Sequence, residues 1–232
     1  MAGKPETATA EYWTDRWKEG KTGWHREEVH NILIKYVDEL TGGRSNLRVF
    51  LPLCGKSVDM LWLADQGHTV VGVELAKHAI ESFFTENNFI FTVESVKMAG
   101  SGEPAEVYKC KEKKITIFCC DLFTFVEEDV GAKFDAIWDR GSLSAIVPSV
   151  NGKRYAKKMH SLLAKDGNCI LESHYYEFER NAPPASISDE LRNELYGEDF
   201  DIKELEVIRM ENVPDMESSY YLRYYLVKPK VI

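Results

Sequence analysis

The chain has 232 residues, of which 44% are hydrophobic and 29% charged, and its formal net charge is −9. This length and apolar content suit one large core, so we expect a single domain over 11–232 behind a flexible, small and polar tail, 1–10. The negative charge disfavours nucleic acid as the main partner. No apolar run reaches the roughly 20 residues of a membrane helix, and the first residues lack the apolar core of a signal peptide.

Strand and helix signals alternate through most of the chain. The spacing of apolar residues predicts helices over 26–40, 58–67, 76–88 and 152–167. Short apolar runs predict strands over 47–53, 68–74, 115–121, 134–139 and 168–174. Gly67 and Gly167 follow two of the helical patterns and are expected as C-terminal caps. Strands that alternate with helices predict a parallel sheet with right-handed crossovers, covered on both faces.

The last part of the chain has a different pattern. A short helix is expected over 188–197, with Ser188 at its N-cap. Two strands are expected over 202–210 and 219–227, joined by a loop that contains Pro214, and they would form an antiparallel pair at the sheet edge. The segment 97–114 is expected to hold an extra loop, and a hairpin within it is considered as well. The fold class is therefore α/β, a Rossmann-like, doubly wound, mostly parallel seven-stranded sheet with an antiparallel C-terminal strand pair.

The segment LPLCGKSVDM follows the first strand and opens a helix, which is where ligands bind in folds of this kind. Gly55 allows backbone to approach a ligand closely, and the helix start offers unpaired N–H groups. A single glycine is neither a dinucleotide fingerprint nor a P-loop. The segment thus favours a ligand with an adenosine and a carboxylate over one with a diphosphate.

Two acidic residues end the next strands. Glu74 follows Gly55 by about twenty residues, the place from which an acid accepts hydrogen bonds from ribose hydroxyls; the alternative is a solvated strand-end glutamate. Asp121 ends the third strand and would flank an adenine, with Leu122 against its face. The alternative for Asp121 is a helix N-cap, and the two roles can coexist.

The segments RVFLPLCGKSVDM, VVGVE, CCDLF and FDAIWDRGSL, in this order and spacing, resemble the thiopurine S-methyltransferase family. The opening EYWTDRWKEGKTGWH resembles the same family, and the likeness covers about 11–175. It implies S-adenosylmethionine as methyl donor, S-adenosylhomocysteine as product, and a small aromatic or heterocyclic thiol as acceptor.

The resemblance also implies a set of site residues. The residues implied for cofactor binding are Trp13, Trp17, Trp24, Leu53, Cys54, Glu74, Asp121, Leu122 and Arg140. Trp24 and Arg140 are implied to border the acceptor as well. Trp13 and Trp17 are one helical turn apart and share a face, which suits a lid over the cofactor; a helix simply packed on the core is the alternative.

Arg140 follows Asp139 at a strand end, and we place both in the catalytic set. Arg140 could hold an anionic acceptor or stabilise a thiolate, and an Asp139–Arg140 pair that fixes the loop is the alternative. Cys54 has no base beside it and is read as a small pocket wall. His25 is a conceivable proton acceptor, with a structural role preferred.

Three departures from the family pattern fall on the acceptor side. Trp24 replaces a usual phenylalanine, a second arginine has no counterpart between Asn212 and Ser219, and the loop after the Pro-Pro pair is shortened to PPASISDEL, 183–191. Halide, sulfide or selenium acceptors and a non-catalytic cofactor-binding role therefore stay as alternatives. A tryptophan lid disfavours a protein acceptor.

The odd number of cysteines, with no Cys-x-x-Cys spacing, predicts free thiols in a cytoplasmic protein. We expect no metal site, no membrane partner and a monomer.

Overall fold

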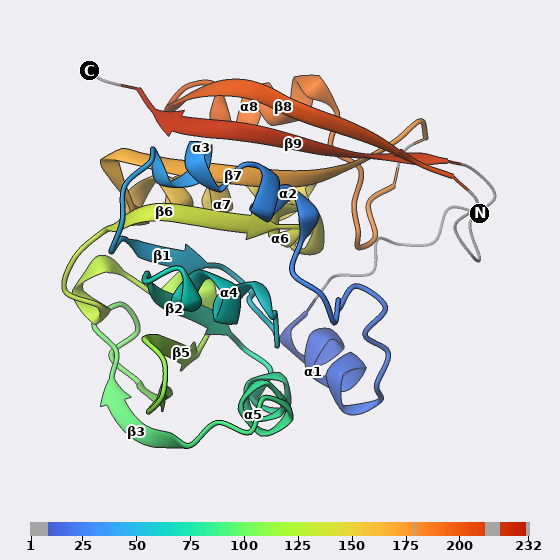
Figure 1. Ribbon diagram of the computed structural model, residues 1–232. Helices are drawn as coiled ribbons and strands as arrows, with labels where there is room; N and C mark the ends of the chain where they lie inside the picture. The colour runs from blue at the N-terminus through green and yellow to red at the C-terminus, as the bar shows by residue number, and fades with distance from the viewer. Residues whose placement is uncertain (1–8, 179, 212–218, 231–232) are drawn as a thin grey trace.

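The computed structural model describes residues 9–178, 180–211 and 219–230, and within them the chain forms one nine-stranded sheet. The strand order is β3-β4-β5-β2-β1-β6-β7-β9-β8 (Figure 1). The strands are β1 (Arg48–Leu51), β2 (Thr69–Glu74), β3 (Phe91–Lys97), β4 (Pro104–Cys110), β5 (Ile115–Cys119), β6 (Phe134–Arg140), β7 (Leu163–Tyr176), β8 (Phe200–Met210) and β9 (Tyr220–Pro229).

The centre of the sheet is parallel and both edges are antiparallel. Strands β5, β2, β1, β6 and β7 run parallel to one another, as the apolar runs predict. The expected C-terminal pair, β9 and β8, follows β7 in antiparallel pairing. The hairpin β3–β4 extends the other edge beyond the seven expected strands. Its second strand and its turn lie in the segment 97–114, where a hairpin was considered, but its first strand, β3, precedes that segment. Most of β3 is exposed, which is why it lacks an apolar pattern.

Helices cover both faces of the sheet (Figure 1). One core cluster contains apolar residues of α2, α3, α4 and α5, and another contains those of α7 and α8. The helices are α1 (Ala10–Lys18), α2 (Asn31–Lys35), α3 (Val37–Thr41), α4 (Asp59–Asp65), α5 (Lys77–Glu86), α6 (Ser142–Ala145), α7 (Pro148–Leu162) and α8 (Asp189–Tyr196), with 3-10 turns η1 (Leu122–Thr124) and η2 (Glu127–Asp129).

Two predicted helices have different bounds. The expected helix 26–40 is divided into α2 and α3, because His30 caps α2 by accepting from the N–H of Ile32 and Tyr36 leaves the helical region. The expected cap at Gly167 is wrong, since α7 ends at Leu162 and Gly167 lies inside β7. The register between β6 and β7 shifts at this point, so the residues before Asn168 form a bulge. The predicted cap at Gly67 does follow α4 closely.

The sheet order reverses at β1, with β2 and β5 on one side and β6 and β7 on the other. Ligands of open α/β sheets bind beyond the carboxyl ends of the strands at such a switch point. Helix α1 lies beyond the ends to which the arrowheads of β1 and β6 point (Figure 1). Residues 1–8 of the expected tail and Pro214 lie outside the described residues, and α1 already begins at Ala10.

Candidate functional site

Glu74 ties the loop after β1 to the end of β2. Its Oε2 accepts from the backbone N–H of Gly55 at 2.9 Å, and its Oε1 accepts from the N–H of Ala76 at 2.8 Å, just before α5. The side chain is only 6% exposed, so the solvated-glutamate alternative does not apply. Burial raises the pKa of Glu74, and the hydrogen bonds from Ala76 and Gly55 oppose that rise. A carboxylate held in this way has lone pairs left for a ligand.

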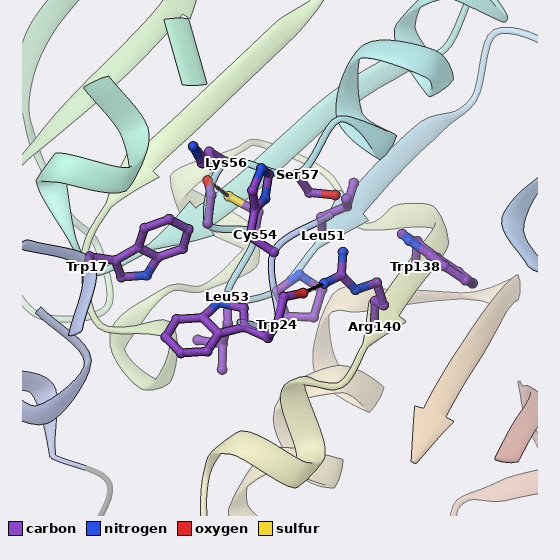
Figure 2. A pocket seen from close by; sticks show the side chains of 12 residues that line it. Trp17, Trp24, Leu51, Leu53, Cys54, Lys56, Ser57, Trp138 and Arg140 are labelled. Carbon is purple, nitrogen blue, oxygen red and sulfur yellow. Dashed lines mark hydrogen bonds between the residues drawn. The ribbon is translucent and has the colours of Figure 1, made fainter. Parts of the chain in front are cut away.

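A cavity of about 490 Å³ opens beyond the carboxyl ends of the parallel strands. This volume lies within the roughly 300–1,000 Å³ of small-molecule sites. Eight of the residues expected at the cofactor line it, namely Trp13, Trp17, Trp24, Leu53, Glu74, Asp121, Leu122 and Arg140. The ninth, Cys54, lines a neighbouring pocket of about 60 Å³ together with Trp17, Trp24 and Arg140 (Figure 2).

Three tryptophans pack against one another at this cavity. The ring centroids of Trp13 and Trp24 are 5.3 Å apart and those of Trp17 and Trp24 are 5.7 Å apart, both edge to face. The guanidinium of Arg16 lies 5.3 Å from the Trp24 ring centre. Trp17 also reaches the backbone of Gly55, where an added Cβ would come within 2.7 Å of its ring. Helix α1 is thereby joined to the loop after β1 by aromatic contacts.

Asp121 combines the two roles considered for it. Its side chain accepts from the N–H of Phe123 at 2.9 Å and so caps η1. The same residue lines the large cavity, beside the buried Leu122. The site therefore has one acid at the last residue of β2 and one just after β5, at neighbouring strand ends.

The side chains of Asp139 and Arg140 point to opposite faces of β6, because side chains alternate along a strand. Arg140 lines both cavities and donates to the carbonyl of Trp24. Asp139 is fully buried among core side chains and accepts from the hydroxyl of Tyr155 at 2.8 Å. Burial raises the pKa of Asp139 to about 7. The structure does not bring Asp139 to either cavity, and we leave it out of the proposed site.

Two further cavity residues come from the end of β7, and the sequence patterns did not single them out. Glu172 stands opposite Arg140 in the register of β6 and β7, and His174 follows on the same face of the strand. The hydroxyl of Ser144 lies 3.2 Å from Nδ1 of His174. Burial lowers the pKa of His174. The signal was present in the ESH triplet at the carboxyl end of a predicted strand, next to the strand that carries Arg140.

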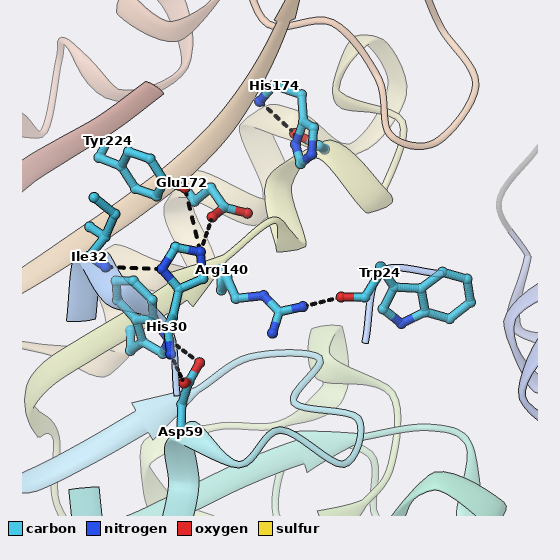
Figure 3. A network of polar contacts seen from close by, with 10 residues as sticks. Trp24, His30, Ile32, Asp59, Arg140, Glu172, His174 and Tyr224 are labelled. Carbon is cyan, nitrogen blue, oxygen red and sulfur yellow. Dashed lines mark hydrogen bonds and ion pairs between the residues drawn. The ribbon is translucent and has the colours of Figure 1, made fainter. Parts of the chain in front are cut away.

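Behind these residues lies a buried polar network (Figure 3). Nε2 of His30 is 3.2 Å from Oε2 of Glu172. The backbone N–H of His30 donates to Asp59 at 2.9 Å, and the indole N–H of Trp138 donates to the other oxygen of Asp59, also at 2.9 Å. The network connects α2, α4, β6 and β7, so it fixes the place of Glu172 relative to the loop after β1.

The cysteines and His25 have modest roles in the site. All five cysteines lie in the described residues and are free thiols. Cys54 is buried, and its Sγ fills the space that a Cβ on Gly72 would need. Burial, followed by the charge of Glu74, raises the pKa of the Cys54 thiol, which suits a pocket wall rather than a nucleophile. Burial and the charges of Lys56 and Arg140 lower the pKa of His25, which lines the smaller pocket.

The described ranges contain no cluster of histidine, cysteine or acidic side chains that could hold a metal ion. In the same ranges, no helix has the length and apolar content required to cross a membrane.

A family model described as thiopurine S-methyltransferase matches residues 8–219. The thiopurine S-methyltransferase of Bos taurus is 40% identical over 208 residues, which are 89% of this chain and 83% of that protein. A probable thiopurine S-methyltransferase of Danio rerio is 42% identical over 186 residues, 80% of this chain and 78% of that protein.

Solved structures share the fold at low identity. A 1,6-didemethyltoxoflavin-N1-methyltransferase of Burkholderia thailandensis, with bound S-adenosylhomocysteine, has a TM-score of 0.65 at 15% identity, covering 98% of this chain and 92% of that one. The magnesium protoporphyrin IX methyltransferase of Synechocystis, with bound S-adenosylmethionine, has a TM-score of 0.61 at 14% identity, covering 99% of each chain. At this identity the likeness establishes the α/β methyltransferase fold alone.

Proposed function

The chain belongs to the thiopurine S-methyltransferase family, and we propose that it transfers the methyl group of S-adenosylmethionine to the sulfur of a small aromatic or heterocyclic thiol, thiopurines included. The observation that carries the proposal is that eight residues implied by the family resemblance line one cavity of about 490 Å³. When bound, S-adenosylmethionine supplies an electrophilic methyl group on a positively charged sulfur.

Several of the chain's own groups suit the donor. Glu74 offers a buried carboxylate for the ribose hydroxyls, and Asp121 and Leu122 offer a polar and an apolar surface for the adenine. The loop at Leu53 and Cys54 would border the methionine part. We propose that Trp13, Trp17 and Trp24 cover the donor as a lid and exclude water. Their mutual packing and the contact of Trp17 with Gly55 support this role.

The contribution of these residues to the rate is positioning. Methyl transfer is an in-line displacement, and holding the acceptor sulfur in line with the methyl group can contribute roughly 7–11 kcal/mol. An acidic thiol is already ionised near neutral pH, so a dedicated base is not essential for such an acceptor. We propose that Trp24 and Arg140 border the acceptor, because both line the two cavities and Arg140 donates to the Trp24 carbonyl.

We also propose that the enzyme acts as a monomer and does not take nucleic acid. The net charge of −9 supports the second point, because the phosphate backbone requires a cationic surface. Light scattering coupled to size exclusion measures the first, and a dimer mass would contradict it.

Incubation with radiolabelled donor and a panel of thiols, hydroxyls, amines and halides tests the reaction. Label should pass to aromatic and heterocyclic thiols. Good transfer to a hydroxyl or amine with none to any thiol would refute the proposal. Donor binding without transfer to any acceptor would favour the cofactor-binding alternative, whose motive, the missing second arginine, falls on 212–218, outside the described residues.

A further inference from the structure

The two halves of the large cavity carry different groups. Glu74 ends β2 and Asp121 follows β5, both on one side of β1. Arg140, Glu172 and His174 come from β6 and β7 on the other side. Because the proposed function assigns the donor to the loop after β1 and to the β2–β5 side, the β6–β7 side is left for the acceptor. A role for Glu172 at the acceptor therefore rests on the proposed function, which does not itself use this residue.

Glu172 presents a fixed negative charge to the acceptor half. The N–H of Ile32 donates to Nδ1 of His30, so the proton of a neutral His30 ring is assigned to Nε2, which lies 3.2 Å from Oε2 of Glu172. The second carboxylate oxygen points away from His30, toward the side on which Arg140 and Trp24 lie (Figure 3). Burial acts to raise the pKa of Glu172, but His30 and the charges of His174 and Arg140 lower it to about 2. The carboxylate is therefore ionised at neutral pH.

The walls around this carboxylate suit a flat ring. The rings of His174 and Tyr220 are stacked with centroids 5.8 Å apart and planes 19° apart, and both residues line the cavity with Trp24. An aryl thiolate placed there would meet the Arg140 cation, but it would also have the like charge of Glu172 beside it and nothing to donate to that carboxylate, which lowers its affinity relative to a ring that can donate. A neutral ring with an N–H group would instead donate a charge-assisted hydrogen bond.

We propose that Glu172 is a specificity-determining residue that selects heterocyclic thiones, rings in which an N–H lies next to the C=S group, over aryl thiols without such an N–H. The ring N–H donates to the carboxylate while the sulfur faces the methyl group.

The step balances with the groups present. A lone pair of the thione sulfur forms the bond to the methyl carbon, as the bond from that carbon to the donor sulfur breaks and leaves its electron pair on that sulfur. The positive charge passes to the methylated ring, which makes its N–H far more acidic. The proton then goes to the carboxylate of Glu172 and on to water, and the product is a neutral S-methyl heterocycle. A weakly basic carboxylate is sufficient, because it acts on a cation.

Glu172→Gln tests the proposal, since the amide keeps the shape and an acceptor oxygen but loses the charge. The probes are pyridine-2-thione, which has the N–H, and thiophenol, which does not. In the variant kcat/KM for pyridine-2-thione should fall by about 10- to 100-fold, the loss expected for a hydrogen bond to a charged group. The value for thiophenol should stay level or rise. An equal change for both acceptors would overturn the proposal.

Glu177→Gln is the matched control, because Glu177 is exposed just after β7 and outside the cavity lining. It should leave both values unchanged. If Glu172→Gln does not fold, the unaltered protein is used instead, and the affinity of each ligand is measured by calorimetry in the presence of S-adenosylhomocysteine. Pyridine-2-thione should then bind at least about tenfold more tightly than its N-methyl analogue, and equal affinities would overturn the proposal.

The two proposals fail in different ways. If the unaltered enzyme methylates neither probe nor any other thiol, the proposed function is wrong. Selective binding of the N–H thione would still support the role of Glu172 in that case.

Discussion

Trp17 lies directly on the backbone of Gly55, so that a Cβ on Gly55 would be 2.7 Å from Cζ2 of the indole. The contact connects the helix at the start of the chain with the loop proposed to hold the methyl donor. Gly55 has a φ of +52°, a conformation that side chains disfavour. Backbone conformation and the approach of Trp17 thus both require a glycine here.

Gly55→Ala should be destabilising and should weaken donor binding. Gly20→Ala is the matched control, because Gly20 has a φ of +69° but nothing within 4 Å of an added Cβ. We expect Gly20→Ala to lower the free energy of unfolding by about 1–2 kcal/mol through backbone strain alone. Gly55→Ala should cost about 1–3 kcal/mol more, since Trp17 must move. Urea unfolding followed by circular dichroism measures both, and equal losses would show that the contact with Trp17 is unimportant.

Glu74→Ala should weaken donor binding by about 1–3 kcal/mol, because it removes the acceptor for the ribose and releases the N–H groups of Gly55 and Ala76. Calorimetric titration with S-adenosylhomocysteine gives the affinity directly. Glu81→Ala, on α5 and outside the cavity lining, should bind as the unaltered protein does. An unchanged affinity for Glu74→Ala would contradict the ribose role.

Arg140→Ala should impair turnover more than folding. Loss of the guanidinium removes a hydrogen bond to the Trp24 carbonyl and the cation at the acceptor, so kcat/KM should fall by about 10- to 100-fold. The unfolding midpoint should shift by no more than a few degrees, about the size of a 1 kcal/mol change. Arg209→Ala, an exposed residue of β8, is the control. A large loss of thermal stability with normal turnover would mean that Arg140 has a structural role only.

Asp139 should make the stability of the protein depend on pH. Its folded pKa of about 7 lies above the ordinary value of 3.8, so the folded state holds a proton that the unfolded state has lost within this window. Stability therefore decreases as pH rises from about 4 to about 7 and is level above that. Between about pH 5 and about pH 7, the free energy of unfolding of the unaltered protein should fall by about 2 kcal/mol relative to that of Asp139→Asn, at up to roughly 1.4 kcal/mol per pH unit.

Chemical unfolding at several pH values measures this difference. The exposed Asp201 of β8 supplies the control, since Asp201→Asn should leave the pH dependence as it is. A constant difference between Asp139→Asn and the unaltered protein would show that Asp139 titrates normally in the fold.

The parallel centre of the sheet could be predicted because strands buried on both faces are apolar along their whole length. The hairpin β3–β4 was expected only in part, since exposed residues dominate β3 and give no period. The division of helix 26–40 was missed because it depends on the His30 side chain, which caps α2 and also contacts Glu172 across the core. Such a tertiary contact leaves no local pattern.

The residues of the site also differ in whether the sequence alone predicts their place. Gly55, Glu74 and Asp121 follow strands that were predicted, and the strand–loop–helix arrangement alone places them at one edge of the sheet. Glu172 gains its position from the pairing of β6 with β7, which sets it opposite Arg140. That register includes a bulge, which the sequence does not reveal. Asp139 was expected in the site together with Arg140, but the side chains of adjacent strand residues point to opposite faces. The sequence alone does not show which face of β6 meets the cavity.

The tryptophans give the protein a built-in optical reporter. Of the five in the sequence, Trp13, Trp17 and Trp24 line the large cavity and Trp138 lines the smaller one, while Trp62 lies on α4. A ligand that enters the large cavity would change the surroundings of Trp13, Trp17 and Trp24 at once, so intrinsic fluorescence should follow donor binding without any label. Replacing Trp62 by phenylalanine would remove one of the two indoles outside that cavity and so lower the constant background, and stopped-flow emission would then time the arrival of each substrate separately.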